Sequence, residues 1–353
     1  MSQPDLRLLR LALLACGAAW TALPAQSVVS PAHFQLADAP GDLEPAIAWG
    51  TYPAQQLQVH DDLVGHAFTV HGIRFRLDGR FPAQAFPSFS IIANAWVSNA
   101  ATTSATLATT YAANHGANKT QVLNQHLLTF PATAWESLPN GFTLDVPFAL
   151  SWSFDGTTPL CWEVEVTYCS NLFGIACDYV AGPDNDPYPA VIEYGQGCTA
   201  SGQPQPVHLG LNAQLPWATQ TLTLNYTGDS LPTGGSPVDI GVFGFALDRL
   251  TAPVTLPGTQ NCPVYMLPDL LFLGITQPSG VLTFSQNLSV TPALHGTNLF
   301  AQVAGLDPTN LQFATSNAVQ MQLVAPFSQS QVGCLRGTTP VVFNGEGFVV
   351  EFY

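Results

Sequence analysis

The stretch GFTLDVPFALSWSFD, residues 141–155, indicates the fold most directly. Large apolar side chains alternate with small or polar ones along it, which is the period of a β-strand with one buried face. The apolar positions are Phe142, Leu144, Val146, Phe148, Leu150, Trp152 and Phe154. Pro147 interrupts the pattern, and because proline has no backbone N–H to donate, it predicts a sheet edge or a bulge there.

Shorter alternating runs recur on both sides of this stretch, with turn-forming residues between them. The runs lie at residues 73–77, 89–97, 162–168, 222–226, 238–242 and 319–323, and the turns include Asn140-Gly141, Asp155-Gly156 and Gly234-Gly235. Many short strands with turns at this spacing are typical of β-sandwiches and jelly rolls. We therefore expect an all-β protein.

The 353 residues exceed the length of one ordinary sandwich, so we expect two tandem antiparallel β-sandwich or jelly-roll-like domains. Pro and Gly concentrate in residues 181–206, which places the boundary near Gly195. The N-terminal domain is then 28–195 and the C-terminal domain 196–353. Its terminal extension, residues 326–353, is expected to return to the second sheet.

Residues 1–27 match a signal peptide. Arg7 and Arg10 precede an apolar run at 11–22, and small residues allow cleavage after Ala25 or Ser27. Lipoprotein processing at Cys16 is the alternative. No later segment has about 20 uninterrupted apolar residues, so no transmembrane helix is expected. The prediction is a secreted, extracellular or cell-surface protein, with the periplasm or a lipid anchor at Cys16 as alternatives.

Charge is scarce and mostly negative. The chain has 8 Lys and Arg against 23 Asp and Glu, a formal net charge of −15. A nucleic-acid partner is excluded, because such proteins neutralise phosphates with Lys and Arg. Three of the few basic residues, Arg74, Arg76 and Arg80, fall on one predicted strand and its turn. We expect the one distinct positive spot of the surface there.

Loss of the signal peptide removes Cys16 and leaves six cysteines, an even number that suggests disulfides in an exported chain. They are Cys161, Cys169, Cys177, Cys198, Cys262 and Cys334. The first four lie close together in the sequence, so we expect pairing within that group and a Cys262–Cys334 bond in the other. A zinc site is the alternative, although no Cys-x-x-Cys is present.

Several short motifs occur in an order that resembles a set of uncharacterised secreted β-sandwich proteins, many from planctomycete-type bacteria. The motifs are QQLQVH at 55–60, GIRFRLDG at 72–79, YAANHG at 111–116, GQGC at 195–198, LPG at 256–258 and GTNLFAQ at 296–302. The tail after Leu323 departs from the pattern. The resemblance implies a sandwich fold and an exported location, and it implies no activity and no catalytic residues.

Glu163 and Glu165 occupy alternate positions of one predicted strand, so both side chains point to the same face. A carboxylate pair on a concave jelly-roll face is how many glycoside hydrolases work. These two glutamates are therefore the candidate catalytic residues. The alternative interpretation is a solvated polar face opposite an apolar one, which alternation alone explains.

Other candidates are a metal or general-base cluster, a calcium loop and a sugar platform. The first comprises His60, Asp61, Asp62, His66 and His71. Asp178, Asp184 and Asp186 offer oxygen ligands for a structural Ca²⁺, the only cofactor expected. Trp135 is the candidate surface aromatic for binding a sugar. Turn, surface and packing roles are the alternatives at each position.

No strong catalytic motif is present, such as Gly-x-Ser-x-Gly or His-Glu-x-x-His. The sequence therefore favours an exported, non-enzymatic binding or structural module, with an extracellular glycan or a surface protein as its partner. The alternative is a jelly-roll glycoside hydrolase or polysaccharide lyase that acts on extracellular glycans.

Overall fold

The chain is described by a computed structural model, in which nearly all of the regular secondary structure is β-strand, as expected. The described residues are 27–39, 54–79, 85–134, 136–170, 175–180, 189–200, 203–215, 221–233, 239–255, 262–307, 311–325 and 331–353. Residues 1–26, which hold most of the predicted signal peptide and Cys16, lie outside them. The helical turns are η1 (Ala32–Phe34), η2 (Asp61–Leu63), α2 (Tyr111–Asn114) and η3 (Pro292–Leu294).

The first pair of sheets encloses one large hydrophobic cluster. Its six-stranded sheet has the order β22 (Val341–Asn344), β21 (Val332–Arg336), β2 (Ala54–His60), β9 (Leu160–Cys169), β5 (Phe89–Asn99) and β6 (Thr120–Phe130). Its four-stranded sheet has the order β1 (Val28–Ser30), β24 (Val350–Phe352), β3 (Phe68–Arg76) and β8 (Phe142–Phe154). Buried Phe75, Trp162 and Phe352 belong to the shared cluster, and neighbouring strands are antiparallel.

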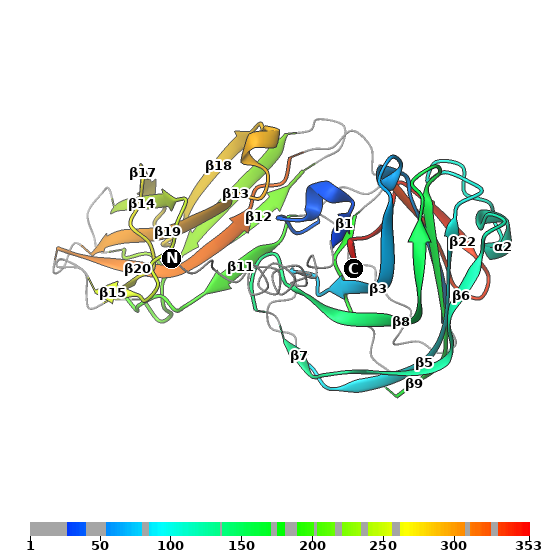
Figure 1. Cartoon of the computed structure of the whole chain (residues 1–353). Helices are drawn as coiled ribbons and strands as arrows, with labels where there is room; N and C mark the ends of the chain where they lie inside the picture. The colour runs from blue at the N-terminus through cyan, green and yellow to red at the C-terminus, as the bar shows by residue number, and fades with distance from the viewer. Residues whose placement is uncertain are drawn as a thin grey trace, which may run out of the picture.

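The second pair of sheets has a core of its own. Its five-stranded sheet has the order β11 (Val191–Tyr194), β20 (Gln312–Gln322), β19 (Asn298–Asp307), β14 (Asp239–Ala246) and β17 (Leu270–Thr276). Its three-stranded sheet has the order β12 (His208–Gln214), β13 (Leu222–Asp229) and β18 (Leu282–Leu288). Tyr226, Phe243 and Met321 lie in its cluster. Figure 1 shows the two pairs of sheets side by side.

Three two-stranded ribbons complete the fold. They are β4 (Ala85–Phe86) with β7 (Thr133–Ala134), β10 (Tyr179–Val180) with β23 (Gly347–Phe348), and β15 (Val254–Thr255) with β16 (Pro263–Val264).

The opening stretch forms a single 13-residue strand, β8, as its alternation predicts. Strand β8 lies at an edge of the four-stranded sheet, and its register with β3 shifts between the pairs Val70–Trp152 and Gly72–Pro147. Both expectations for Pro147 are therefore confirmed. The bulge also explains why Leu150 is exposed although the period places it on the apolar face.

The end of the chain joins the first pair of sheets. Strand β21 pairs with β2, and β24 lies between β1 and β3. The expectation that residues 326–353 return to the second sheet is wrong, because β2 and β3 need these strands as hydrogen-bonding neighbours. The second pair of sheets is therefore inserted between β10 and β21, and it already begins at β11, before Gly195.

The observed disulfide joins Cys198 to Cys262 within the second pair of sheets. The expected Cys262–Cys334 bond is therefore wrong, because Cys334 lies on β21 in the first pair. Cys161, Cys177 and Cys334 are buried thiols, so pairing among all six cysteines is not what the structure shows. The Cys198–Cys262 bond is compatible with an extracellular protein.

Candidate functional site

Glu163 and Glu165 lie on the outer face of β9, on the side away from the core of the first pair of sheets. Glu163 is opposite Trp96 on β5, and Glu165 is opposite Asn94. The neighbouring Trp162 points the other way, into the core cluster. The prediction that both carboxylates share one face is confirmed.

The carboxylate of Glu163 is fully engaged by its neighbours. Gln55 Nε2 donates to Oε1 at 2.6 Å, while His115 Nε2 and Lys119 Nζ lie 2.7 and 2.6 Å from Oε2. Burial would raise the pKa of Glu163, but the hydrogen bonds from His115 and Lys119 outweigh it and hold the pKa below its usual value. Glu163 is therefore an ionised acceptor inside a closed network.

A further contact extends this network to Ser98, whose Oγ lies 2.7 Å from His115 Nδ1. Burial lowers the pKa of His115, so the imidazole is neutral near pH 7. Because ionised Glu163 can only accept, His115 donates from Nε2 and accepts the Ser98 proton at Nδ1. A serine hydroxyl that donates to a histidine, which in turn donates to a carboxylate, is the hydrogen-bond order of a catalytic triad.

The hydrogen-bonded group of Ser98, His115 and Glu163 is nevertheless buried. Ser98 has no exposed surface, and the side chain of Glu163 is 3% exposed. The segment that carries His115 and Lys119 covers this face of the sheet, and a small apolar cluster beneath it includes Leu57 and Leu335. A substrate cannot reach the serine hydroxyl or the Glu163 carboxylate, so the network fastens the segment to the sheet.

Glu165 has a simpler environment. Its Oε2 accepts one hydrogen bond from Asn94 Nδ2 at 2.8 Å, and Asn94 Oδ1 accepts from the backbone N–H of Gln125. With Glu163 enclosed, the two glutamates do not form an open acid and nucleophile pair of the kind that a glycosidase needs.

The predicted histidine and aspartate cluster is only partly brought together. His60 is buried, and its Nε2 accepts a hydrogen bond from Trp162 Nε1 at 2.8 Å. Its Nδ1 lies 2.6 Å from Ser30 Oγ, which donates to Asp62 Oδ1 at 2.6 Å. Burial lowers the pKa of His60 to about 3, so this ring is a neutral structural link.

The other members of that cluster have separate environments. Asp61 accepts from the backbone N–H and the hydroxyl of Ser104, and His66 and His71 are exposed. Among the residues that the structure describes, no three His, Cys, Asp or Glu side chains are grouped to hold a metal ion.

Arg76 and Asp178 form a fully buried ion pair. Arg76 Nε donates to Asp178 Oδ2 at 2.6 Å, and Arg76 Nη2 donates to the carbonyls of Phe34 and Ala37. Asp178 Oδ1 accepts from the backbone N–H of Ala39. The prediction that Arg76 contributes to a positive spot on the surface is therefore wrong, because residues 34–39 cover the Arg76 side chain.

Asp178 is also a predicted calcium ligand, and its oxygens accept hydrogen bonds from Arg76 and Ala39 instead.

Arg74 belongs to the predicted positive spot. It is half-buried, and its side chain lies 3.2 Å from Glu351 and over the ring of Tyr353. Arg80, Trp135, Asp184 and Asp186 lie outside the described residues.

Asp38 adds a second buried carboxyl group next to this ion pair. Its Oδ1 accepts from the backbone N–H of Gly79 at 3.2 Å, whereas its buried Oδ2 has no hydrogen-bond partner among the described residues. Burial, followed by the charges of Asp178 and Asp78, raises the pKa of Asp38 well above its usual value. The arrangement favours a neutral carboxylic acid at this position.

A polar pocket of about 450 Å³ lies at one end of the second pair of sheets. Glu193, His208 and Asp229 contribute its ionisable groups, and His208 Nε2 lies 2.9 Å from a carboxylate oxygen of Glu193. The lining suits a small hydroxylated or cationic group, and both members of the His208–Glu193 pair are about half exposed.

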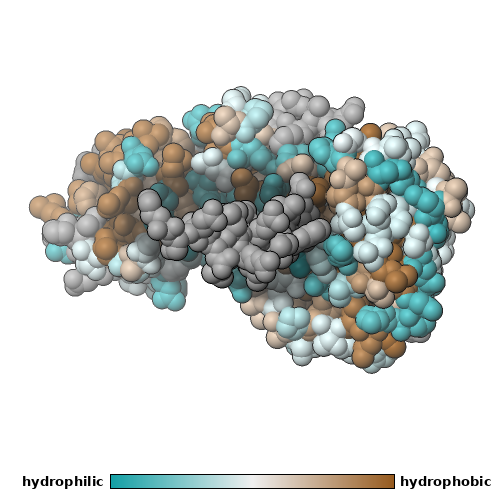
Figure 2. All heavy atoms as spheres, viewed as in Figure 1, coloured by the Kyte–Doolittle hydropathy of each residue, from teal (hydrophilic) through white to brown (hydrophobic). Residues whose placement is uncertain are grey.

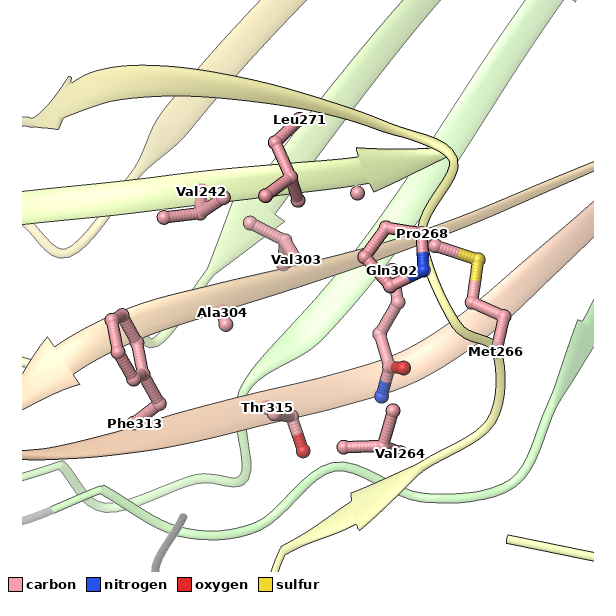
Figure 3. A pocket seen from close by; sticks show the side chains of 11 residues that line it. Val242, Val264, Met266, Pro268, Leu271, Gln302, Val303, Ala304, Phe313 and Thr315 are labelled. Atoms are coloured by element: carbon pink, nitrogen blue, oxygen red, sulfur yellow. The ribbon is translucent and has the colours of Figure 1, made fainter. Parts of the chain in front are cut away.

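A second, apolar pocket of about 290 Å³ opens on the outer face of the five-stranded sheet (Figure 3). It is lined by Val242, Gly244, Val264, Met266, Pro268, Leu271, Gln302, Val303, Ala304, Phe313 and Thr315. Its polar side chains are already used: Gln302 bonds the backbone of Pro263, Tyr265 and Ser316, and Thr315 Oγ1 donates to Pro263 O. The pocket therefore offers an apolar environment.

The sheet face beside this pocket is apolar and exposed. Leu271, Leu273 and Ile275 of β17 are 58, 77 and 68% exposed, and Ile240 of β14 lies directly opposite Ile275. Figure 2 shows hydrophobic side chains gathered at the end of the molecule where Figure 1 places β14 and β17. Single exposed apolar residues are ordinary, but a contiguous group marks an interaction surface.

Sequence reasoning missed this surface. The run LLFLGIT at 270–276 is apolar at consecutive positions, which is the pattern of a strand buried on both faces. In the described structure, the side of β17 that carries Phe272 faces the core cluster, and the other side is exposed. The consecutive apolar residues of this run could therefore have indicated an exposed apolar face.

In comparisons with known proteins, no family model, no curated protein and no solved structure matches the chain. The resemblance to planctomycete-type secreted proteins stays a prediction. Among the described residues, the longest apolar helix is too short to cross a membrane.

The closed network predicts different roles for the two glutamates. Glu163→Gln removes the negative charge that faces Lys119 and leaves one oxygen to accept hydrogen bonds where the carboxylate has two, and we expect a loss of about 2 kcal/mol of unfolding free energy. Glu165→Gln keeps an acceptor for Asn94 and is expected to cost less than about 0.5 kcal/mol. Urea unfolding of both variants measures this, and equal stabilities would contradict it.

Asp38→Asn is expected to stabilise the protein, and more so at pH 8 than at pH 5. The pKa of Asp38 is raised above its usual 3.8, so its contribution to stability is present at low pH and is lost as the pH rises. Asparagine does not ionise and keeps the acceptor for Gly79. Unfolding free energies across this pH range measure the difference, and a difference independent of pH would contradict the assignment.

Proposed function

We propose that this chain is a non-enzymatic binding module that works outside the cytoplasm, and that its binding surface is the apolar outer face of the five-stranded sheet. The observation that carries the proposal is the apolar pocket together with the exposed side chains of β17. Water contact with such a surface is unfavourable, so a partner that covers it gains free energy from burial.

The chemistry of the pocket favours an apolar group of a surface protein over a glycan. A sugar needs hydrogen-bonding groups, usually beside an exposed aromatic ring, to match its hydroxyls. The amide of Gln302 and the hydroxyl of Thr315 are already bonded to the protein. Among the described cavities, the polar pocket with Glu193, His208 and Asp229 suits a glycan better. If the partner is a glycan, we expect it to bind there.

The extracellular location rests on the sequence of residues 1–27, with support from the Cys198–Cys262 disulfide. The hydrolase or lyase alternative based on Glu163 and Glu165 has little support, because the Glu163 carboxylate is enclosed by Gln55, His115 and Lys119. A catalytic carboxylate must reach the glycosidic bond directly.

The apolar pocket predicts binding of a neutral apolar dye such as Nile red. Leu271→Lys places a charge at the pocket and is expected to weaken dye binding about tenfold, which corresponds to about 1.4 kcal/mol. Leu150→Lys is the matched control, because Leu150 is 60% exposed and Leu271 is 58% exposed, and Leu150 lies on β8. Fluorescence titration of the three proteins measures the dissociation constants.

The proposal is contradicted if the protein leaves the dye unbound, or if the Leu150 and Leu271 variants bind it equally well. Circular dichroism of both variants establishes that the substitutions leave the fold intact.

A further inference from the structure

Strand β17 is an edge strand of the five-stranded sheet. It pairs with β14 from Leu270 to Thr276, and no strand of the described residues lies on its other side. Within the described part of the chain, the backbone groups that point away from β14 have no strand partner, so another chain can pair with them.

This edge lacks the devices that usually protect one. Proteins block open edges with charged residues, with proline or with bulges. The strand reads LLFLGIT and holds no charge and no proline. Its register with β14 runs without a shift from the pair Asp239–Thr276 to the pair Phe245–Leu270. The edge is thus regular, apolar and ready to pair.

The strand is self-complementary about its centre, Leu273. In an antiparallel pair of two identical β17 strands, Leu273 lies opposite the second copy's Leu273, and Leu271 lies opposite the second copy's Ile275. At the ends, Asp269 falls opposite the second copy's Gln277, so no carboxylates oppose each other in a chain of net charge −15.

The side chains along this edge are apolar and exposed. Five side chains at this edge are 54 to 77% exposed: Leu267, Leu270, Leu271, Leu273 and Ile275. Leu271, Leu273 and Ile275 lie on the outer face, so in the antiparallel pair they meet the same three side chains of the second copy.

We propose that β17 is a dimerisation edge, at which two copies of this chain join their five-stranded sheets around a two-fold axis. The inference rests on the proposed function, because β17 forms the rim of the same apolar face, and the join would enlarge that face without covering it. The join brings the two apolar faces side by side and adds cross-strand contacts between their leucine and isoleucine side chains.

Sedimentation equilibrium of the full chain over a concentration series tests the proposal. We expect the wild-type protein to dimerise at micromolar concentration, and we expect Leu273→Lys to weaken dimerisation at least 100-fold, because it sets two ammonium groups face to face at the axis. Ile275→Lys is a second variant on the same edge, and both positions are exposed enough to tolerate lysine in the folded monomer.

Leu127→Lys is the matched control. Leu127 is 61% exposed and lies on β6, which is an edge strand of the six-stranded sheet. Its dimerisation constant should equal that of the wild type. A monomeric wild-type protein, a dimer that survives both β17 substitutions, or an equal loss in the Leu127 variant would overturn the proposal.

Dye binding separates this proposal from the proposed function. A wild-type monomer that binds the dye would remove the dimer and leave the binding surface. A dimer that does not bind the dye would support the dimerisation edge and contradict the proposed binding pocket.

Discussion

The buried ion pair between Arg76 and Asp178 is the contact on which the arrangement of the chain depends. It joins β3 to the segment before β10, and the Arg76 guanidinium fixes residues 34–39 through two carbonyls. The same segment reaches the second pair of sheets, because Gln322 on β20 bonds the N–H of Asp38 and the carbonyl of Leu36. Loss of one partner would leave an uncompensated buried charge, which is strongly destabilising.

Most of the reactive side chains in the first pair of sheets are used in holding it together. His60 links β2 to Trp162 and Ser30, and Glu163 holds the segment that carries His115. Groups that are buried and hydrogen-bonded in this way stabilise a structure but offer little to a ligand. The second pair of sheets differs, because its outer face at β14 and β17 is open and apolar. This division places the proposed binding surface away from the polar networks.

The sequence predicted local structure well and distant contacts poorly. Alternation identified β8, the two-faced strand of Glu163, and the edge position of Pro147, because the period of a strand is a local property. It assigned Arg76 and Glu163 to a solvated face, since nothing local shows that residues 34–39 and the segment of His115 cover them. The return of β21 and β24 and the Cys198–Cys262 bond are contacts between distant segments, which spacing alone does not determine.

The central proposal is that two copies of this chain pair at the apolar edge of β17. The most direct test is hydrogen–deuterium exchange of the β17 amides at increasing protein concentration. We predict that amides in Leu270–Thr276 exchange more slowly as concentration rises, while those of the edge strand β6 do not change. Exchange at β17 that is independent of concentration would contradict the claim.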